Sequence, residues 1–110
     1  HSRCGGIRSL VLDSKKLPQD TFIARWMSIV APVADLADPH RLHDHATFNY
    51  CEQAAVGYSL RNLMTYPFIK ERVEAGTLSL KGWHYNILTG SLKQIHDQDT
   101  ISTIVEEAQD

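Results

Sequence analysis

The sequence contains only two cysteines, Cys4 and Cys51, in 110 residues. Two cysteines are too few for the disulfide framework that stabilises many small secreted proteins. We therefore expect thiols that bind metal or pack in a core, in a reducing compartment. A cytoplasmic location is the first expectation, but an organellar or exported one stays open because the chain starts at His1 rather than at methionine.

Long apolar runs and basic clusters are also missing. Arg25, Pro32 and Asp35 interrupt the apolar residues of 22–36, so no run reaches the roughly 20 residues that a transmembrane helix needs. Lysine and arginine number 11 against 13 acidic residues, and the net charge is −2. The sequence has no cluster of basic residues that would attract the phosphates of a nucleic acid. We expect one domain at most, with neither a membrane nor nucleic acid as a partner.

Apolar residues at three- and four-residue steps predict helices in much of the first 76 residues. The predicted helices cover residues 7–11, 21–31, 46–65 and 67–75. The second should pack on a core through Phe22, Ile23, Trp26, Met27 and Val30. Pro67 is suited to start the last of these helices, and Gly76 is suited to end it.

The apolar period changes from helical to alternating after Gly76. Alternation in residues 77–87, followed by Leu92 and Ile95, predicts a β-hairpin over 77–96. Trp83 and Tyr85 alternate along its first strand, so at least one of them should enter the core. Helical spacing returns at 101–105 and predicts a short terminal helix.

The chemistry of the first residues suits a metal ion. His1 and Cys4 form a His-x-x-Cys pair, and an imidazole with a thiolate suits zinc, which binds nitrogen and sulfur tetrahedrally. Gly5 and Gly6 have no side chains, so the backbone can pass close to a bound group there. They also begin a helix whose N-terminal N–H groups favour an anion. The residues alone leave a second interpretation open, in which this is a chance pair beside a glycine turn.

Two other groups of potential ligands favour structural roles. His40, His43 and His45 could form a separate metal site, but they lie among polar residues without a matched thiolate, so a solvated loop is the favoured interpretation. Cys51 falls within the long predicted helix, where a cysteine usually packs as a small hydrophobic residue.

The order of several motifs resembles the β-class carbonic anhydrases. The first seven residues, His1-Ser2-Arg3-Cys4-Gly5-Gly6-Ile7, are similar to the His-Ser-x-Cys-Gly-Gly signature of that family. Later segments resemble family segments in the same order: Ser59-Leu60-Arg61-Asn62-Leu63, Thr65-Tyr66-Pro67-Phe68, Gly76-Thr77-Leu78, and Gly82-Trp83-His84-Tyr85-Asn86-Ile87 with Thr89-Gly90 and Leu92. For residues 35–50 we can place no resemblance to a family segment.

The resemblance implies an α/β fold in which helices and a C-terminal β-hairpin belong to a mostly parallel central sheet. It also implies one Zn²⁺ per subunit, with His1 and Cys4 as metal ligands and Gly5 and Gly6 as active-site backbone. The family's other cysteine and its Asp-Arg dyad belong to a Cys-x-Asp-x-Arg motif that this sequence lacks. Residues 1–110 are therefore expected to be the C-terminal part of a single domain.

The implied reaction is reversible hydration of carbon dioxide to bicarbonate and a proton. Zinc-bound water, with its pKa lowered to about 7, supplies the hydroxide that attacks carbon dioxide. In some family members a tyrosine at the position of Tyr85 helps to bind bicarbonate at an effector site, so Tyr85 is a candidate for that role. The family also implies a homodimer or a higher homo-oligomer.

Two functional hypotheses remain at this point. The first is a carbonic anhydrase whose complete chain is active and whose residues 1–110 alone are inactive. The second is a non-catalytic helical interaction or assembly module that retains the fold.

Overall fold

The computed structural model describes residues 1–13, 18–37, 39–41 and 43–96. In chain order the elements are α1 (Gly5–Asp13), α2 (Phe22–Met27), the 3₁₀ helix η1 (Ser28–Leu36), α3 (His45–Leu63), α4 (Pro67–Glu74), β1 (Gly82–Tyr85) and β2 (Leu92–Ile95). The terminal helix predicted at 101–105 lies outside the described residues.

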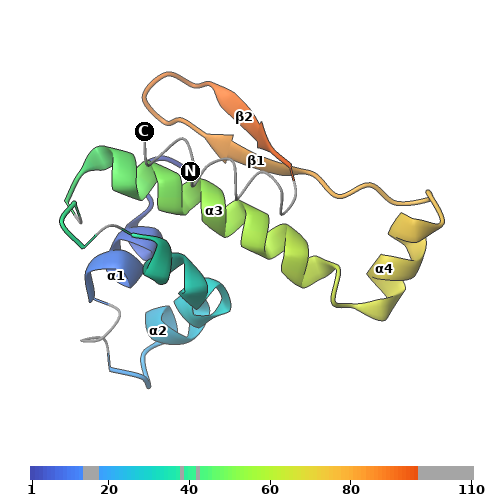
Figure 1. Ribbon diagram of the computed structural model, residues 1–110, viewed down its shortest axis with the longest axis horizontal. Helices are drawn as coiled ribbons and strands as arrows, with labels where there is room; N and C mark the ends of the chain where they lie inside the picture. Colours follow the sequence, from blue (N-terminus) through green and yellow to red (C-terminus); the bar gives the residue numbers. More distant parts are fainter. Residues whose placement is uncertain (14–17, 38, 42, 97–110) are drawn as a thin grey trace.

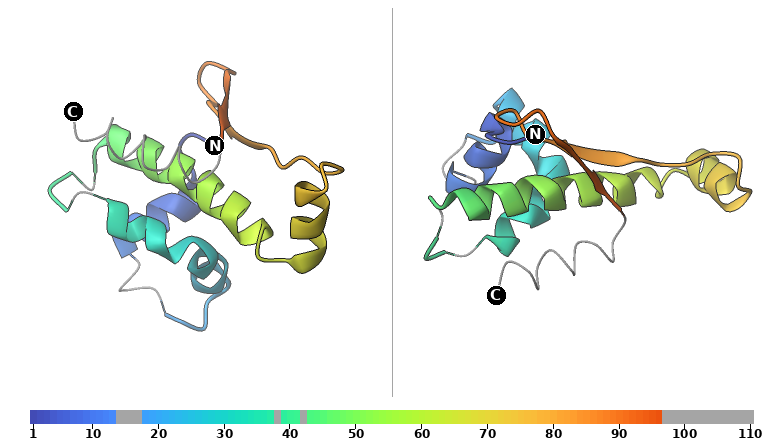
Figure 2. Two further views of the ribbon diagram at one scale, coloured as in Figure 1. Left: turned by 45° about the vertical axis from the view of Figure 1, so that its right-hand side comes forward. Right: turned by 90° about the horizontal axis from the view of Figure 1, so that it is seen from above.

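Helix α3 is the centre of the fold, and it contacts α1, η1 and both strands. Helices α1, α2 and η1 lie on one side of α3 and the β-hairpin on the other, while α4 extends from its far end (Figures 1 and 2). The core comprises Ile7, Leu10, Val11, Met27, Val30, Val33, Ala37, Phe48, Tyr50, Cys51 and Ala54. Helix α3 therefore connects the N-terminal helices to the hairpin.

The helix predicted at 21–31 is shorter than expected, and part of its predicted core face is wrong. The α-helix ends at Met27 and the chain continues as a 3₁₀ helix with Pro32 inside it. Met27 is buried, whereas Phe22 and Trp26 are 91% and 63% exposed. At about 100° per residue, positions four apart share a face, and the face of Phe22 and Trp26 points away from the core that Met27 enters.

The predicted break between the two later helices is confirmed. Helix α3 ends at Leu63, and α4 begins with Pro67 in its first turn. The N–H groups in the first turn of a helix have no helical acceptor. Proline lacks an N–H, so at this position it costs no helical hydrogen bond. Gly76 has φ +76° just after α4, a left-handed conformation that only glycine adopts readily.

The hairpin is confirmed, with antiparallel pairing from Gly82 with Ile95 to Tyr85 with Leu92. The prediction that Trp83 or Tyr85 enters the core is wrong, since they are 51% and 45% exposed. A Cβ added at Gly82 would lie 2.6 Å from Cγ1 of Val56, so the β1 backbone rests directly on α3. Side chains alternate along a strand, so His84 shares the inner face with Gly82 and both aromatic rings point outward.

These two strands form the only sheet among the described residues, and it is antiparallel. The mixture of helices and a hairpin is consistent with part of an α/β fold, while the mostly parallel central sheet stays a prediction. None of the helices in the described ranges is both long and apolar enough to cross a membrane.

Candidate metal centre

The loop that precedes α1 is fastened to the hairpin by Ser2. The Ser2 backbone N–H donates to the carbonyl oxygen of Tyr85 at 2.8 Å, and the Ser2 hydroxyl oxygen accepts from the N–H of Ile87 at 2.8 Å. Ser2 is buried even though both neighbouring residues are exposed. Ser2, one of the two residues between the predicted ligands, is thus held at the end of β1.

The backbone turns sharply after this anchor. Arg3 has φ +55°, the only positive φ of a non-glycine residue in the described part of the chain. A left-handed conformation costs a bulky L-residue about 1–3 kcal/mol and persists where its surroundings fix it. Hydrogen bonds on both sides of Arg3, at Ser2 and at Cys4, supply that restraint.

His1 is exposed, and one of its ring nitrogens is already engaged. Its Nδ1 lies 2.7 Å from the carbonyl oxygen of Ser2, which can only accept, so Nδ1 carries the proton and donates. In a neutral ring the lone pair then resides on Nε2. Metal-binding histidines use the same arrangement, in which a second partner fixes the tautomer and orients the ring.

Cys4 is a free, partly buried cysteine at the start of α1. Its carbonyl oxygen accepts the first helical hydrogen bond, from the N–H of Arg8 at 3.0 Å. The two glycines after it differ in their surroundings. A Cβ at Gly6 would lie 2.9 Å from Sδ of Met27, so α1 and α2 pack closely there, whereas a Cβ at Gly5 would meet no described atom within 4 Å.

A buried pair of polar side chains, not predicted from the sequence, lies next to this loop. His84 Nε2 and Glu52 Oε1 are 2.9 Å apart, with side chains 5% and 3% exposed. The other carboxylate oxygen of Glu52, Oε2, accepts a long hydrogen bond from the N–H of Cys4 at 3.4 Å. Glu52 on α3 therefore contacts both the hairpin and the loop. Glu52 is the only acidic residue of the helix predicted at 46–65, and this was the only signal.

Cys51 occupies a different environment from Cys4. It is fully buried, and its thiol donates a weak hydrogen bond to the carbonyl oxygen of Val33 at 3.8 Å. Burial, with a smaller contribution from the charge of Glu52, raises the pKa of Cys51 from 9.0 to about 11. A metal ligand must be a thiolate, so Cys51 is a core residue, as the sequence predicted.

This contrast predicts selective alkylation. At pH 8 in metal-free protein, iodoacetamide should modify Cys4 at least tenfold faster than Cys51, because Cys51 is buried and protonated. Peptide mass spectrometry after timed quenching measures both rates, and equal rates would contradict the burial. The raised pKa also means that the stability contributed by the buried thiol is present below pH 9 and lost as the pH rises from 9 to about 11.

The other sequence candidates do not join the loop. His40, His43 and His45 are exposed; the first two lie in the loop before α3, as predicted, whereas His45 is the first residue of α3. In the described ranges, no three side chains of histidine, cysteine, aspartate or glutamate come together as a metal site. Tyr85 contributes its backbone carbonyl to the loop while its ring is exposed, and its effector role stays a prediction.

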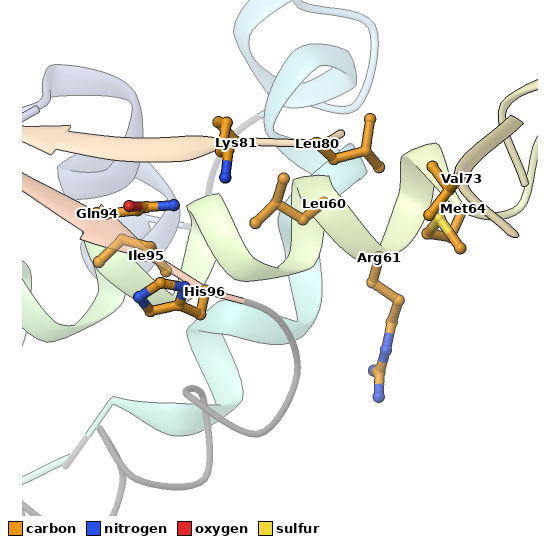
Figure 3. Close-up of a pocket in the computed structure, with 9 residues that line it drawn as sticks. All are labelled: Leu60, Arg61, Met64, Val73, Leu80, Lys81, Gln94, Ile95 and His96. Atoms are coloured by element: carbon orange, nitrogen blue, oxygen red, sulfur yellow. The ribbon is translucent and has the colours of Figure 1, made fainter. Parts of the chain in front are cut away.

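A cavity of about 510 Å³ lies away from the loop, between α3, α4 and the hairpin (Figure 3). Its lining residues are Leu60, Arg61, Met64, Val73, Leu80, Lys81, Gln94, Ile95 and His96. Figure 3 shows the Arg61 side chain pointing away from Leu80 and Lys81, so the lining does not converge on a charged ligand. None of the predicted site residues borders it, and the loop remains the candidate site.

The donor chemistry of this loop fits zinc. An imidazole with its tautomer fixed and a free thiol are separated by two residues whose backbone is held on both sides. Nitrogen and sulfur donors are the set that zinc prefers. Two donors do not complete a tetrahedral site, so a zinc ion bound here would need a further protein donor.

Comparison with known proteins gives the family. A family model described as carbonic anhydrase matches residues 1–92. Beta carbonic anhydrase 5, chloroplastic, from Arabidopsis thaliana is 37% identical over 90 residues, which cover 80% of this chain and 30% of that protein. Beta carbonic anhydrase 3 from the same plant is 38% identical over 95 residues, which cover 83% and 37%.

No solved structure matched the chain. The chain spans about a third of the length of the two curated relatives. The family match nevertheless includes the His1–Cys4 loop, the α3–α4 break and strand β1, and it extends through residues 35–50, where no family segment was expected. From these matches, the chain belongs to the β-carbonic anhydrase family.

Proposed function

We propose that the complete protein containing this chain is a zinc-dependent carbonic anhydrase that reversibly hydrates carbon dioxide to bicarbonate and a proton. Family membership supports the reaction. The observation that carries the proposal is the His1–Cys4 loop, in which both predicted ligands flank a buried, doubly hydrogen-bonded serine. A loop fixed in this way presents an imidazole and a thiol at defined positions.

His1 and Cys4 would hold the zinc ion, through Nε2 and Sγ respectively. When bound, zinc acts as a Lewis acid that lowers the pKa of water to about 7, which makes hydroxide available near neutral pH. The Ser2 carbonyl orients the His1 ring by accepting from Nδ1. The close packing at Gly6 sets the start of α1, and with it the position of Cys4.

The rest of the site and its assembly are also part of the proposal. One zinc per subunit, a further ligand and catalytic groups outside residues 1–110, and a homo-oligomer follow from the family. Residues 1–110 alone supply two ligands and should be inactive. Exposed apolar side chains on α2 and η1, among them Phe22, Trp26 and Ile29, are consistent with burial in an assembly.

Metal analysis and kinetics of the complete protein test this proposal together. Purified without added metal, it should contain about one zinc per subunit by plasma mass spectrometry, and stopped-flow indicator assays should show carbon dioxide hydration that a zinc chelator abolishes. Residues 1–110, expressed alone, are the matched control and should show neither property. A zinc-free, inactive complete protein would instead support the assembly-module hypothesis.

A further inference from the structure

Glu52 is the most deeply buried carboxylate near the candidate metal centre, with 3% of its side chain exposed. A buried carboxylate is costly unless both oxygens find donors. Here Oε1 lies 2.9 Å from His84 Nε2, and Oε2 accepts from the Cys4 backbone N–H. Each oxygen therefore has a partner, and the two partners come from segments 80 residues apart in the sequence.

The three residues connect the parts of the fold that surround the loop. Glu52 lies on α3, His84 lies on the inner face of β1, and Cys4 directly precedes α1. The hairpin already holds the loop through Ser2. Glu52 adds a second attachment, on the other side of Arg3 and at the predicted ligand itself.

Two attachments of this kind determine the backbone conformation between the ligands. Ser2 fixes one end of this segment, and the start of α1 fixes the Cys4 carbonyl through the N–H of Arg8, but neither of them engages the Cys4 N–H. The contact with Glu52 holds the Cys4 N–H, which directly follows Arg3, and helps to keep Arg3 at φ +55°. Groups that orient metal ligands typically contribute about 10–100-fold in metal affinity.

We propose that Glu52 is a positioning residue for the metal loop: it holds the Cys4 backbone in the ligand geometry and is itself held by His84. The inference rests on the proposed function only in its metal readout, because hydrogen exchange at the Cys4 amide can be measured in metal-free protein. Glu52 acts through Cys4 and needs no contact with substrate.

The experiment uses the complete protein and three variants. Glu52→Ala removes both contacts, whereas Glu52→Gln retains a carbonyl oxygen that can accept from the Cys4 N–H. Gln53→Ala is the matched control, because Gln53 is the next residue on α3, is also buried, and has no hydrogen bond to the loop. Zinc release to a chromophoric chelator and hydrogen exchange at the Cys4 amide in metal-free protein are measured for each.

Glu52→Ala should release zinc about 10–100-fold faster and exchange the Cys4 amide at least tenfold faster. Glu52→Gln should stay within about threefold of the unaltered protein in both measurements, and Gln53→Ala should match it. If Glu52→Ala fails to fold, Glu52→Asp replaces it, because shortening by one methylene withdraws the carboxylate from the amide and should have the same effects.

Unchanged zinc release and unchanged Cys4 exchange in a folded Glu52→Ala or Glu52→Asp protein would overturn the proposal. Equal acceleration by Gln53→Ala would also overturn it, since the effect would then be general loosening of α3. Absence of zinc from the unaltered protein counts against the proposed function instead, and the exchange data still decide whether Glu52 holds the loop.

Discussion

Replacing Cys4 with serine or His1 with alanine in the complete protein should remove most of the bound zinc. Each change deletes one of the two proposed donors in this chain. The loss of metal affinity should therefore exceed the roughly 10–100-fold loss that follows removal of a group that only orients a ligand. We expect the zinc content to fall below about a tenth per subunit and the hydration rate to fall at least about 1,000-fold. Metal analysis and stopped-flow kinetics measure both.

The control for these ligand variants is His43→Ala. His43 is an exposed histidine outside the metal loop, so its removal should leave zinc content and turnover within about twofold. The comparison separates loss of a ligand from loss of any histidine. Full zinc content in either the Cys4→Ser or the His1→Ala protein would show that these residues do not bind the metal.

Replacing Gly82 with alanine should have the second large effect, on stability. The added Cβ would lie 2.6 Å from Cγ1 of Val56 and 3.0 Å from Cδ1 of Leu60, so β1 has to move away from α3. Val56 is β-branched and has little freedom to move aside. We expect the free energy of unfolding to fall by about 1–3 kcal/mol, the usual cost of overpacking. Urea denaturation of the metal-free protein measures it.

Gly5→Ala is the matched control, because a Cβ at Gly5 meets no described atom within 4 Å. Its free energy of unfolding should change by less than about 1 kcal/mol. The Gly82 variant should also weaken the metal loop, since Ser2 is hydrogen-bonded to the strand that moves. Equal stability of the Gly82→Ala and unaltered proteins would mean that β1 does not rest on α3 as described.

Local signals in the sequence predicted much of the fold. Proline at position 67 and glycine at position 76 limit the backbone directly, so the interruption after α3 and the end of α4 were predicted correctly. The hairpin at 82–95 followed from apolar alternation. These features depend on a few neighbouring residues, which a sequence displays without knowledge of the tertiary fold.

The inner face of β1 could not be predicted in the same way. Alternation shows that Trp83 and Tyr85 share a face of β1. Their large apolar rings led to the wrong prediction, that this face enters the core. The decisive residue is Gly82, whose missing side chain lets the strand backbone approach Val56 on α3. That contact joins distant segments, so the burial of His84 was visible only in three dimensions.

The candidate site shows the same division between local and distant signals. His1 and Cys4 were found because their spacing and the neighbouring glycines form a motif. Glu52 was missed because its partners, Cys4 and His84, lie 48 and 32 residues away in the sequence. A glutamate on a predicted helix is usually assigned to solvent, and only packing shows that this one is buried between the loop and the hairpin.

X-ray absorption at the zinc edge of the complete protein tests the central claim most directly. We expect nitrogen and sulfur atoms bound directly to the zinc, at about 2.0–2.1 Å and about 2.3 Å respectively. The sulfur contribution should decrease in any zinc that the Cys4→Ser protein retains. A zinc ion bound by nitrogen and oxygen alone, or a sulfur contribution that the Cys4 substitution leaves unchanged, would contradict binding of zinc by the His1–Cys4 loop.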